Sequence, residues 1–388
     1  MAGSRGARVA LWLSLVVPSS FIVHKYSGWE GLAAYGVVSA AIVAAAAARG
    51  TRLLARASDR TVVGLALITL ALAIVVFAVG YPIADTRAPG AGSDDDNTLD
   101  LGASALLAGR FPYAQTTYLG NALHHFAGAF LIAAPFALLG ASALQNLFWI
   151  PLFFAAMGAE MRDGRRALEI AWLVLALCPA VLYDVVTGTG YASNTIYVAL
   201  GLWWLTRTRR RDAAAAAWGV ALASRANFLL LVPLAAGWLQ RHAGRRAAAR
   251  STAITCATVA LLTIPFYLHD PRSFGPLEGA DRLLRFDALV PHLGAALIAS
   301  MAALSLGLAV TGMDTAALFR NCAWVQALPV AAGIVLASLQ ERRVNLWYAR
   351  YGAFFAWFAL MALAAGGSLK RDETARRQLV DEREQVGL

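Results

Sequence analysis

Charged side chains are scarce in this chain. Only 14% of its 388 residues are Asp, Glu, Lys or Arg, whereas 59% are hydrophobic and the mean hydropathy is +0.59. A soluble protein of this length needs more charge to cover its surface, so the composition excludes an ordinary soluble domain. It predicts an all-α, polytopic membrane protein of the cytoplasmic (inner) membrane.

Acidic residues are the scarcer kind, with 23 against 33 basic ones and a net charge of +10. The basic residues do not form the continuous patch that nucleic-acid binding requires, so no nucleic-acid partner is expected. They gather in short clusters between apolar stretches, and the positive-inside bias predicts that these clusters are cytoplasmic. The clusters are Arg49/Arg52/Arg56/Arg60, Arg162/Arg165/Arg166, Arg207/Arg209/Arg210/Arg211, Arg241/Arg245/Arg246/Arg250 and Lys370/Arg371/Arg376/Arg377.

Cysteine is rare as well. Cys178, Cys256 and Cys322 lie in or near apolar stretches, and their spacing implies neither a disulfide framework nor a metal site. The N-terminal residues resemble a signal peptide in charge and apolar core but have no small-x-small cleavage site. We therefore expect an uncleaved first helix.

Apolar stretches lie at 9–24, 30–48, 61–81, 122–139, 142–160, 167–183, 191–206, 213–239, 251–268, 291–312, 318–338 and 350–367. A crossing needs about twenty residues, so we expect roughly ten to twelve membrane helices. If the arginine clusters share one side, 122–139 is partial or re-entrant. On the same premise, 213–239 enters and returns, with a break near 224–227.

These stretches suggest four parts of the chain. We expect an N-terminal helical hairpin with a cytoplasmic loop (1–60), a central membrane module (61–290), C-terminal membrane helices (291–369) and a cytoplasmic tail (370–388).

The longest polar interruption spans residues 82–121. It carries four carboxylates, at Asp94, Asp95, Asp96 and Asp100, followed by an amphipathic run that ends near Phe111-Pro112-Tyr113. Parity places this loop outside the cytoplasm. Loops of such length without regular structure are uncommon unless they bind or catalyse, so we expect the functional site here.

Arginines also occur at membrane depth. Arg225 interrupts the apolar stretch 213–239, and an arginine at mid-membrane costs about 3 kcal/mol even on the lenient insertion scale, so it needs a partner. A structural ion pair, snorkelling and a contact to phosphate or sugar all stay open. Arg282 and Arg285 lie in what reads as an interfacial amphipathic helix, where arginines contact lipid headgroups or grip one lipid phosphate.

Three pieces of sequence occur in an order that resembles a known family. They are the acidic loop with ALLAGRFPY and YLGNALHHFAGAFLIAAPFALLG, then AAWGVALASRANFLLLVPL, then LTIPFYLHDPRSF. Across about residues 61–290 they resemble GT-C type glycosyltransferases, integral membrane enzymes that use polyprenyl-phosphate sugars, and within them the bacterial mannosyltransferase-like subgroup. The hairpin at 9–48 departs from that family, and no large extracellular domain is expected at the C-terminus.

The resemblance implies that an aspartate of the first outer loop is the catalytic base. The matching positions are Asp94, Asp95 and Asp96, with Asp94 or Asp96 favoured. Repulsion between adjacent carboxylates raises the pKa of one of them, which suits it to accept a proton. Two alternatives stay open: a solvated acidic loop, and calcium or magnesium binding by the same carboxylates, although DDDN lacks the spacing of a calcium loop.

Nine further residues, one at membrane depth and the others outside it or near the helix ends, are candidates for substrate binding, although a structural role is open for each. They are Arg225, His124, His125, Tyr113, His269, Arg272, Asp184, Tyr191 and Asn194.

The predicted function is transfer of a hexose or pentose from a polyprenyl-phosphate donor to a lipid-linked or glycan acceptor. The reaction is expected to invert the anomeric carbon at an outward-facing site, with membrane lipids as partners and a divalent metal left open. A transporter or lipid flippase is the main rival, since broken helices and an arginine at depth occur there too. A non-catalytic scaffold is the third.

Overall fold

The computed structural model describes residues 5–48, 53–88, 92–277 and 282–367. Within these residues the chain is all helical, and the one extended pairing is an isolated bridge between Thr116 and Ala122. The tail predicted at 370–388, with its basic cluster, and residues Arg49 and Arg52 lie outside the described residues.

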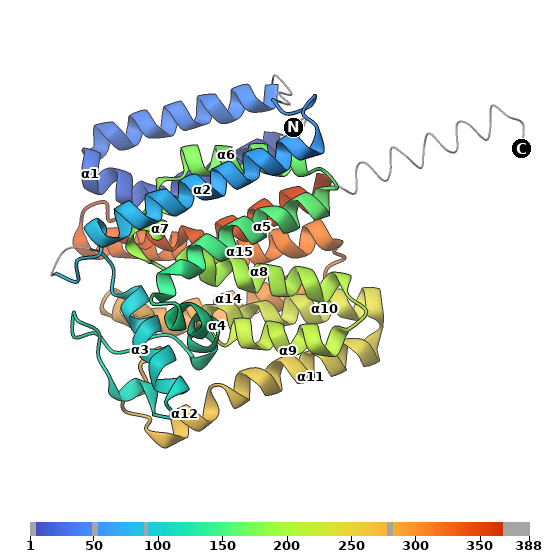
Figure 1. Ribbon diagram of the computed structural model, residues 1–388. Helices are drawn as coiled ribbons and strands as arrows, with labels where there is room; N and C mark the ends of the chain where they lie inside the picture. The colour runs from blue at the N-terminus through green and yellow to red at the C-terminus, as the bar shows by residue number, and fades with distance from the viewer. Residues whose placement is uncertain (1–4, 49–52, 89–91, 278–281, 368–388) are drawn as a thin grey trace, which may run out of the picture.

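Most of the helices run side by side along one direction (Figure 1). In chain order they are α1 (Arg5–Ala48), α2 (Asp59–Ala84), α3 (Asp95–Leu107), α4 (Ala127–Leu138), α5 (Gln145–Met161), α6 (Gly164–Leu177), α7 (Pro179–Thr187), α8 (Tyr191–Arg207), α9 (Arg211–Leu222), α10 (Val232–Ala243), α11 (Arg245–Leu261), α12 (Ile264–His269), α14 (Leu293–Val310), α15 (Thr315–Glu341) and a last helix at 353–367.

Seven helices in the described residues are long and apolar enough to cross a membrane, or eight if the bent pair α6–α7 forms one span. A multi-pass membrane protein is therefore confirmed. Helix α2 shows why: its best window has a mean hydropathy of 3.0 and none of its residues is buried, so its surface suits lipid. The count stays below the predicted ten to twelve because several apolar stretches are broken. Helices α6 and α7 meet at 80°, and α9 and α10 have 12 residues each.

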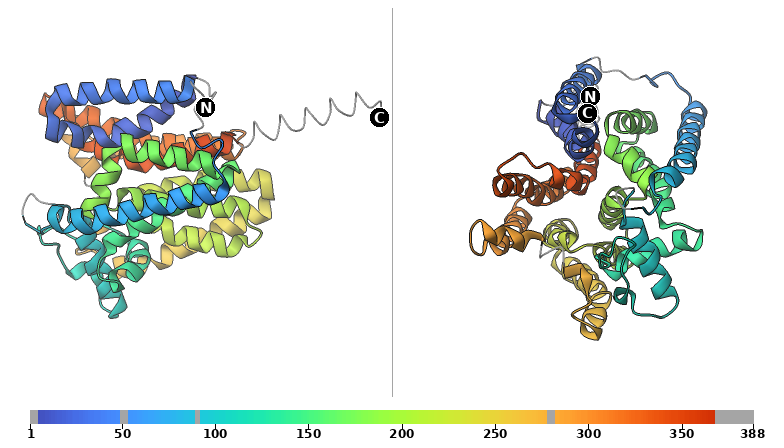
Figure 2. Two further views of the ribbon diagram at one scale, coloured as in Figure 1. Left: turned by 45° about the horizontal axis from the view of Figure 1, so that its top comes forward. Right: turned by 90° about the vertical axis from the view of Figure 1, so that its left-hand side faces the viewer.

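The predicted N-terminal hairpin is present. Helix α1 folds back on itself at Gly28, whose φ of 67° is in the left-handed region that glycine adopts without strain. Figure 1 and Figure 2 show the two arms side by side. The Trp12 Nε1–H joins them, lying 3.2 Å from both the Gly36 carbonyl oxygen and the Ser39 hydroxyl.

The described arginine clusters lie at one end of the bundle, where α2, α6, α9 and α11 begin and α5, α8 and α10 end (Figure 1). We call this the arginine end. Ion pairs connect its helices: Arg165 with Asp59 at 2.7 Å, Arg207 with Glu160, and Arg250 with Asp212. The shared location agrees with the parity argument from sequence.

The stretch 213–239 breaks where predicted. Helix α9 ends at Leu222, the turn η3 spans Ala226–Leu231, and α10 then returns to the arginine end. The residues between α9 and η3 lie deep in the fold, and Ser224 is fully buried. Arg225 therefore emerges from irregular backbone inside the protein rather than from a continuous helix.

Helices α3 and α4 lie at the opposite end of the bundle (Figure 1). Helix α4 has only 12 residues, too few for a full crossing, which agrees with the predicted partial span. Two glycines permit close packing here. A Cβ on Gly102 of α3 would lie 2.3 Å from the Phe130 ring of α4, and one on Gly128 would lie 2.2 Å from the Ala223 carbonyl oxygen. This packing brings the start of α3 next to Arg225.

Candidate active site

The acidic run of the outer loop is part of a helix. Helix α3 begins at Asp95, and carboxylates in a first turn are stabilised by the helix dipole. Asp95 and Asp96 are both buried. The alternative of a solvated acidic loop is therefore wrong for these two residues. Their carboxylates need partners within the fold.

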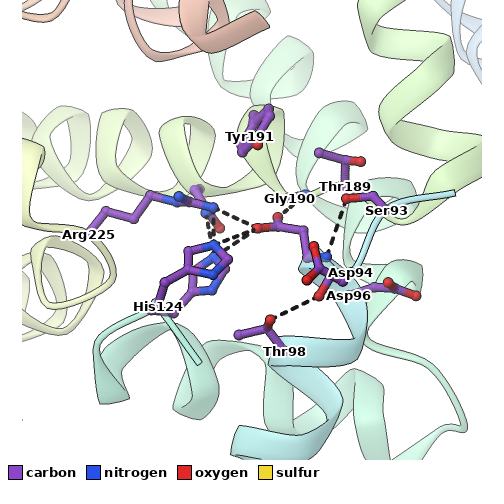
Figure 3. A network of polar contacts seen from close by, with 12 residues as sticks. Ser93, Asp94, Asp96, Thr98, His124, Thr189, Gly190, Tyr191 and Arg225 are labelled. Atoms are coloured by element: carbon purple, nitrogen blue, oxygen red, sulfur yellow. Dashed lines mark hydrogen bonds and ion pairs between the residues drawn. The ribbon is translucent and has the colours of Figure 1, made fainter. Parts of the chain in front are cut away.

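Asp95 receives partners on both carboxylate oxygens, and Figure 3 shows three of these partners, Arg225, His124 and Gly190, close together. Its Oδ1 lies 2.8 Å from Nη2 of Arg225 and 3.3 Å from Nε2 of His124, while its Oδ2 accepts a hydrogen bond from the Gly190 amide at 2.7 Å. Burial opposes the ionised carboxylate. The charge of Arg225, helped by the hydrogen bond from His124, outweighs burial and holds the pKa of Asp95 well below its usual range.

His125 is next to this ion pair and is completely buried. Its Nε2 lies 2.8 Å from Nη2 of Arg225. A guanidinium can only donate, so this nitrogen accepts and the ring proton belongs on Nδ1. Burial, and then the charge of Arg225, lower the pKa of His125 well below its usual range, which keeps the ring neutral.

Arg225 is held by aromatic rings as well as by Asp95. Its guanidinium carbon lies 5.2 Å from the ring centre of Tyr191 and 5.4 Å from that of Phe354. Its side chain keeps 10% exposure and that of His124 keeps 15%, against 3% for Asp95. Arg225 and His124 are thus the members of the cluster that an incoming molecule can reach first.

A second group of cations adjoins Arg225 through Tyr191. We call it the arginine–aromatic group; it consists of Arg282, Arg285, Arg350, Trp347, Tyr348 and Tyr351. The Arg350 guanidinium carbon is 3.9 Å from the Trp347 ring centre and 5.8 Å from that of Tyr191. Arg282 Nη1 donates to the Tyr351 hydroxyl at 2.9 Å. Within the described residues no carboxylate forms an ion pair with these three arginines, so among these residues the group has an excess of positive charge.

The turn between α7 and α8 supplies the Gly190 amide. Asn146 Nδ2 donates to the carbonyl oxygens of Asp184 at 2.7 Å and Thr189 at 3.1 Å, which fixes the path of this turn. The Asp184 carboxylate accepts the Ala192 amide at 3.0 Å and so holds the start of α8. Asp184 therefore shapes the site and does not contact the Arg225 cluster.

The other two carboxylates of the run face elsewhere. Asp94 Oδ2 accepts hydrogen bonds from the Thr117 hydroxyl at 2.8 Å and the Asn121 amide at 2.7 Å. Asp96 Oδ2 accepts the Tyr81 hydroxyl of α2 at 2.5 Å. Burial raises the pKa of Asp96 to about 8, against the hydrogen bond from Tyr81. Of the three predicted bases, only Asp95 lies among the cations.

The structure gathers part of the predicted set of substrate-binding residues. Arg225, His124, His125 and Tyr191 meet at Asp95, and Asn194 Nδ2 is 3.4 Å from Nε2 of His125. Both histidines precede α4 rather than beginning it.

Three predicted residues lie apart from this cluster. Tyr113 is buried and donates to the His125 carbonyl oxygen at 3.0 Å, so it supports the backbone. His269 is exposed against Phe111, with ring centres 4.5 Å apart, and Arg272 is exposed in the next turn. Arg350 was missed from sequence, although an arginine within the aromatic run LWYARY was a usable signal.

One group in the described residues has the ligand atoms of a metal site: Asp95, His124 and His125, whose nitrogens and oxygen lie within 4.8 Å of one another. The Nη2 atom of Arg225, however, is 2.8 Å from both Asp95 Oδ1 and His125 Nε2. A guanidinium already satisfies these two atoms, and a metal cation would have to displace it. The residues as arranged do not fit a metal.

Comparison with known proteins adds no relative: no family model, no curated protein and no solved structure matches the chain. The interpretation of the site therefore depends on its own geometry.

Proposed function

We propose that this chain is a GT-C type glycosyltransferase that moves a hexose or pentose from a polyprenyl-phosphate donor to a lipid-linked or glycan acceptor. The observation that carries the proposal is the buried ion pair of Asp95 and Arg225 with the partly exposed His124 at its edge. Sugar transfer needs a proton acceptor for the attacking hydroxyl and a cation for the leaving phosphate. Both kinds of group meet here within hydrogen-bonding distance.

The surplus of arginine supports a phosphate-bearing substrate. Arg225 has Asp95 as its counter-ion, whereas Arg350, Arg282 and Arg285 have no carboxylate partner among the described residues. Planar guanidinium groups bind phosphate oxygens in pairs, and aromatic rings keep their planes fixed. We place the donor phosphate between Arg225 and the arginine–aromatic group.

Access from the bilayer supports a lipid-linked donor. Helix α2, whose residues are all accessible, ends beside the carboxylates, and its Tyr81 donates directly to Asp96. A polyprenyl chain lying along α2 has its phosphate close to the start of α3. A soluble nucleotide-sugar donor has no lipid chain that could lie along this lipid-facing side.

The positive-inside bias gives the orientation that we propose. It places the arginine end in the cytoplasm and so directs Asp95 towards the outer face of the cytoplasmic membrane. The 12-residue helices α9 and α10 then enter the membrane from the cytoplasmic side and return to it. Polyprenyl-phosphate sugars on the outer leaflet would meet the site directly.

The test is transfer by the purified protein. Radiolabelled polyprenyl-phosphate sugars are incubated with the protein and a membrane lipid extract, and labelled products are separated. We expect a labelled product that disappears with Asp95→Asn but persists with Asp212→Asn, a matched change in the ion pair at the arginine end. Movement of the donor across proteoliposomes without a new glycosidic bond would instead establish the transporter.

A further inference from the structure

His124 and Asp95 are in contact within the site but differ in their exposure and in their hydrogen-bond partners. Building on the proposed function, we infer that His124 accepts the proton of the acceptor hydroxyl and that Asp95 orients His124 without taking the proton itself. The family resemblance instead implies that an aspartate accepts this proton.

Asp95 is poorly placed to be the base. Both of its oxygens already accept N–H groups, from Arg225 at 2.8 Å and Gly190 at 2.7 Å. Its side chain is only 3% exposed, so a sugar or lipid hydroxyl has little access to either oxygen. A carboxylate held by a guanidinium is stabilised as the anion and is a weak proton acceptor.

His124 has the complementary properties. Its Nε2 lies 3.3 Å from Asp95 Oδ1, and a carboxylate that only accepts requires the ring proton on that nitrogen. The lone pair is therefore on Nδ1. With 15% of its side chain exposed, His124 is also more accessible than Arg225, Asp95 and His125.

His125, the next residue in the chain, lacks these properties. The Nε2 atom of His125 accepts from Arg225, so its lone pair is already used, and the residue is fully buried. Of two consecutive histidines, only His124 combines a carboxylate partner, a free lone pair and access from outside. This is the arrangement in which a carboxylate orients an imidazole base.

The step balances as one displacement. The acceptor oxygen forms a bond to the anomeric carbon while the bond from that carbon to the donor phosphate oxygen breaks and its electron pair leaves with the phosphate. The hydroxyl proton moves to His124 Nδ1. Asp95 then faces an imidazolium, and Arg225 faces the extra negative charge on the leaving phosphate. Solvent removes the proton to complete the cycle.

The test compares His124→Ala, His124→Gln and Asp95→Ala in the transfer assay, with His24→Asn in the α1 hairpin as the control. We expect either change at His124 to lower kcat by roughly a hundredfold or more while the donor KM stays within about threefold. Added imidazole should restore part of the activity of His124→Ala. Formate should not restore Asp95→Ala, because a diffusing carboxylate cannot orient the histidine.

Two results would overturn the inference. If both His124 variants keep more than about a tenth of the activity, or if formate rescues Asp95→Ala while imidazole fails with His124→Ala, Asp95 is the base and the proposed function stands. If the unmodified chain transfers no sugar from any polyprenyl-phosphate donor, the proposed function fails and this inference fails with it. Binding of labelled donor to each variant shows that its fold is retained.

Discussion

Replacing Arg225 by leucine tests the ion pair at the centre of the site. The change leaves Asp95, with a 3% exposed side chain, without the guanidinium 2.8 Å away. Removing one partner of a buried pair costs about 3–5 kcal/mol of unfolding free energy. Arg225→Lys keeps a cation beside Asp95, so it should cost much less stability but still lower transfer, because it lacks the planar fork.

The sign of the pH dependence makes this prediction sharper. In the unmodified chain the pKa of Asp95 is lowered, so its contribution to stability is present above the unfolded pKa and lost in acid. Without Arg225, burial raises that pKa above the unfolded value. Relative to the unmodified chain, Arg225→Leu should then lose stability as pH rises from 5 to 8, by up to about 1.4 kcal/mol per pH unit.

The assay is denaturant unfolding of the detergent-solubilised protein at several pH values. A double variant, Arg225→Leu with Asp95→Asn, serves as the control, because it removes the buried charge as well. It should recover about 2 kcal/mol and lose the added pH dependence. If Arg225→Leu were as stable as the unmodified chain at pH 8, the ion pair would make no contribution and the reasoning would be refuted.

Three other changes give separate predictions. The pKa of Asp96 is raised to about 8, so the stability that its protonated form contributes is lost as pH rises towards 8. Asp96→Asn should remove this loss when thermal unfolding is measured at several pH values. An unchanged pH dependence in the variant would contradict the prediction. A Cβ on Gly190 would lie 2.9 Å from Asp95 Oδ2, so Gly190→Ala should reduce transfer. A Cβ on Gly64 would have no neighbouring atom within 4 Å, so Gly64→Ala should leave transfer unchanged. Equal activities of the two variants would count against the contact between Gly190 and Asp95. In a cysteine-free background, Arg209→Cys should resist an impermeant thiol reagent in intact cells, whereas labelling from outside would reverse the topology.

The sequence predicted those features that depend on local composition. The helical fold, the hairpin of α1 and the break before η3 follow from apolar stretches and their interruptions. The shared position of the arginine clusters follows from the positive-inside bias, which acts on every loop. The helix count was less predictable, because whether an apolar stretch bends, as α6–α7 does by 80°, depends on packing against other helices.

The choice among Asp94, Asp95 and Asp96 could not be made from sequence. Successive residues of a helix point about 100° apart, so the three carboxylates face different neighbours once α3 docks. That docking depends on the contact of Phe130 with Gly102 and on the position of Arg225, both distant in sequence. Because sequence spacing does not encode this rotation, the position of Asp95 beside Arg225 and His124 emerges only from the fold.

The separation of Asp95 from Arg225 also bears on how the protein is made. The two residues are 130 positions apart, and α4 to α9 are synthesised between them. Until the ribosome has delivered Arg225, the nascent chain holds a carboxylate whose burial is unfavourable. We therefore expect the first turn of α3 to stay in water during insertion and to dock only after α9 is in place. Maturation of the site would then be a late event in biogenesis, and chains arrested before Arg225 would expose an unfinished surface to membrane proteases.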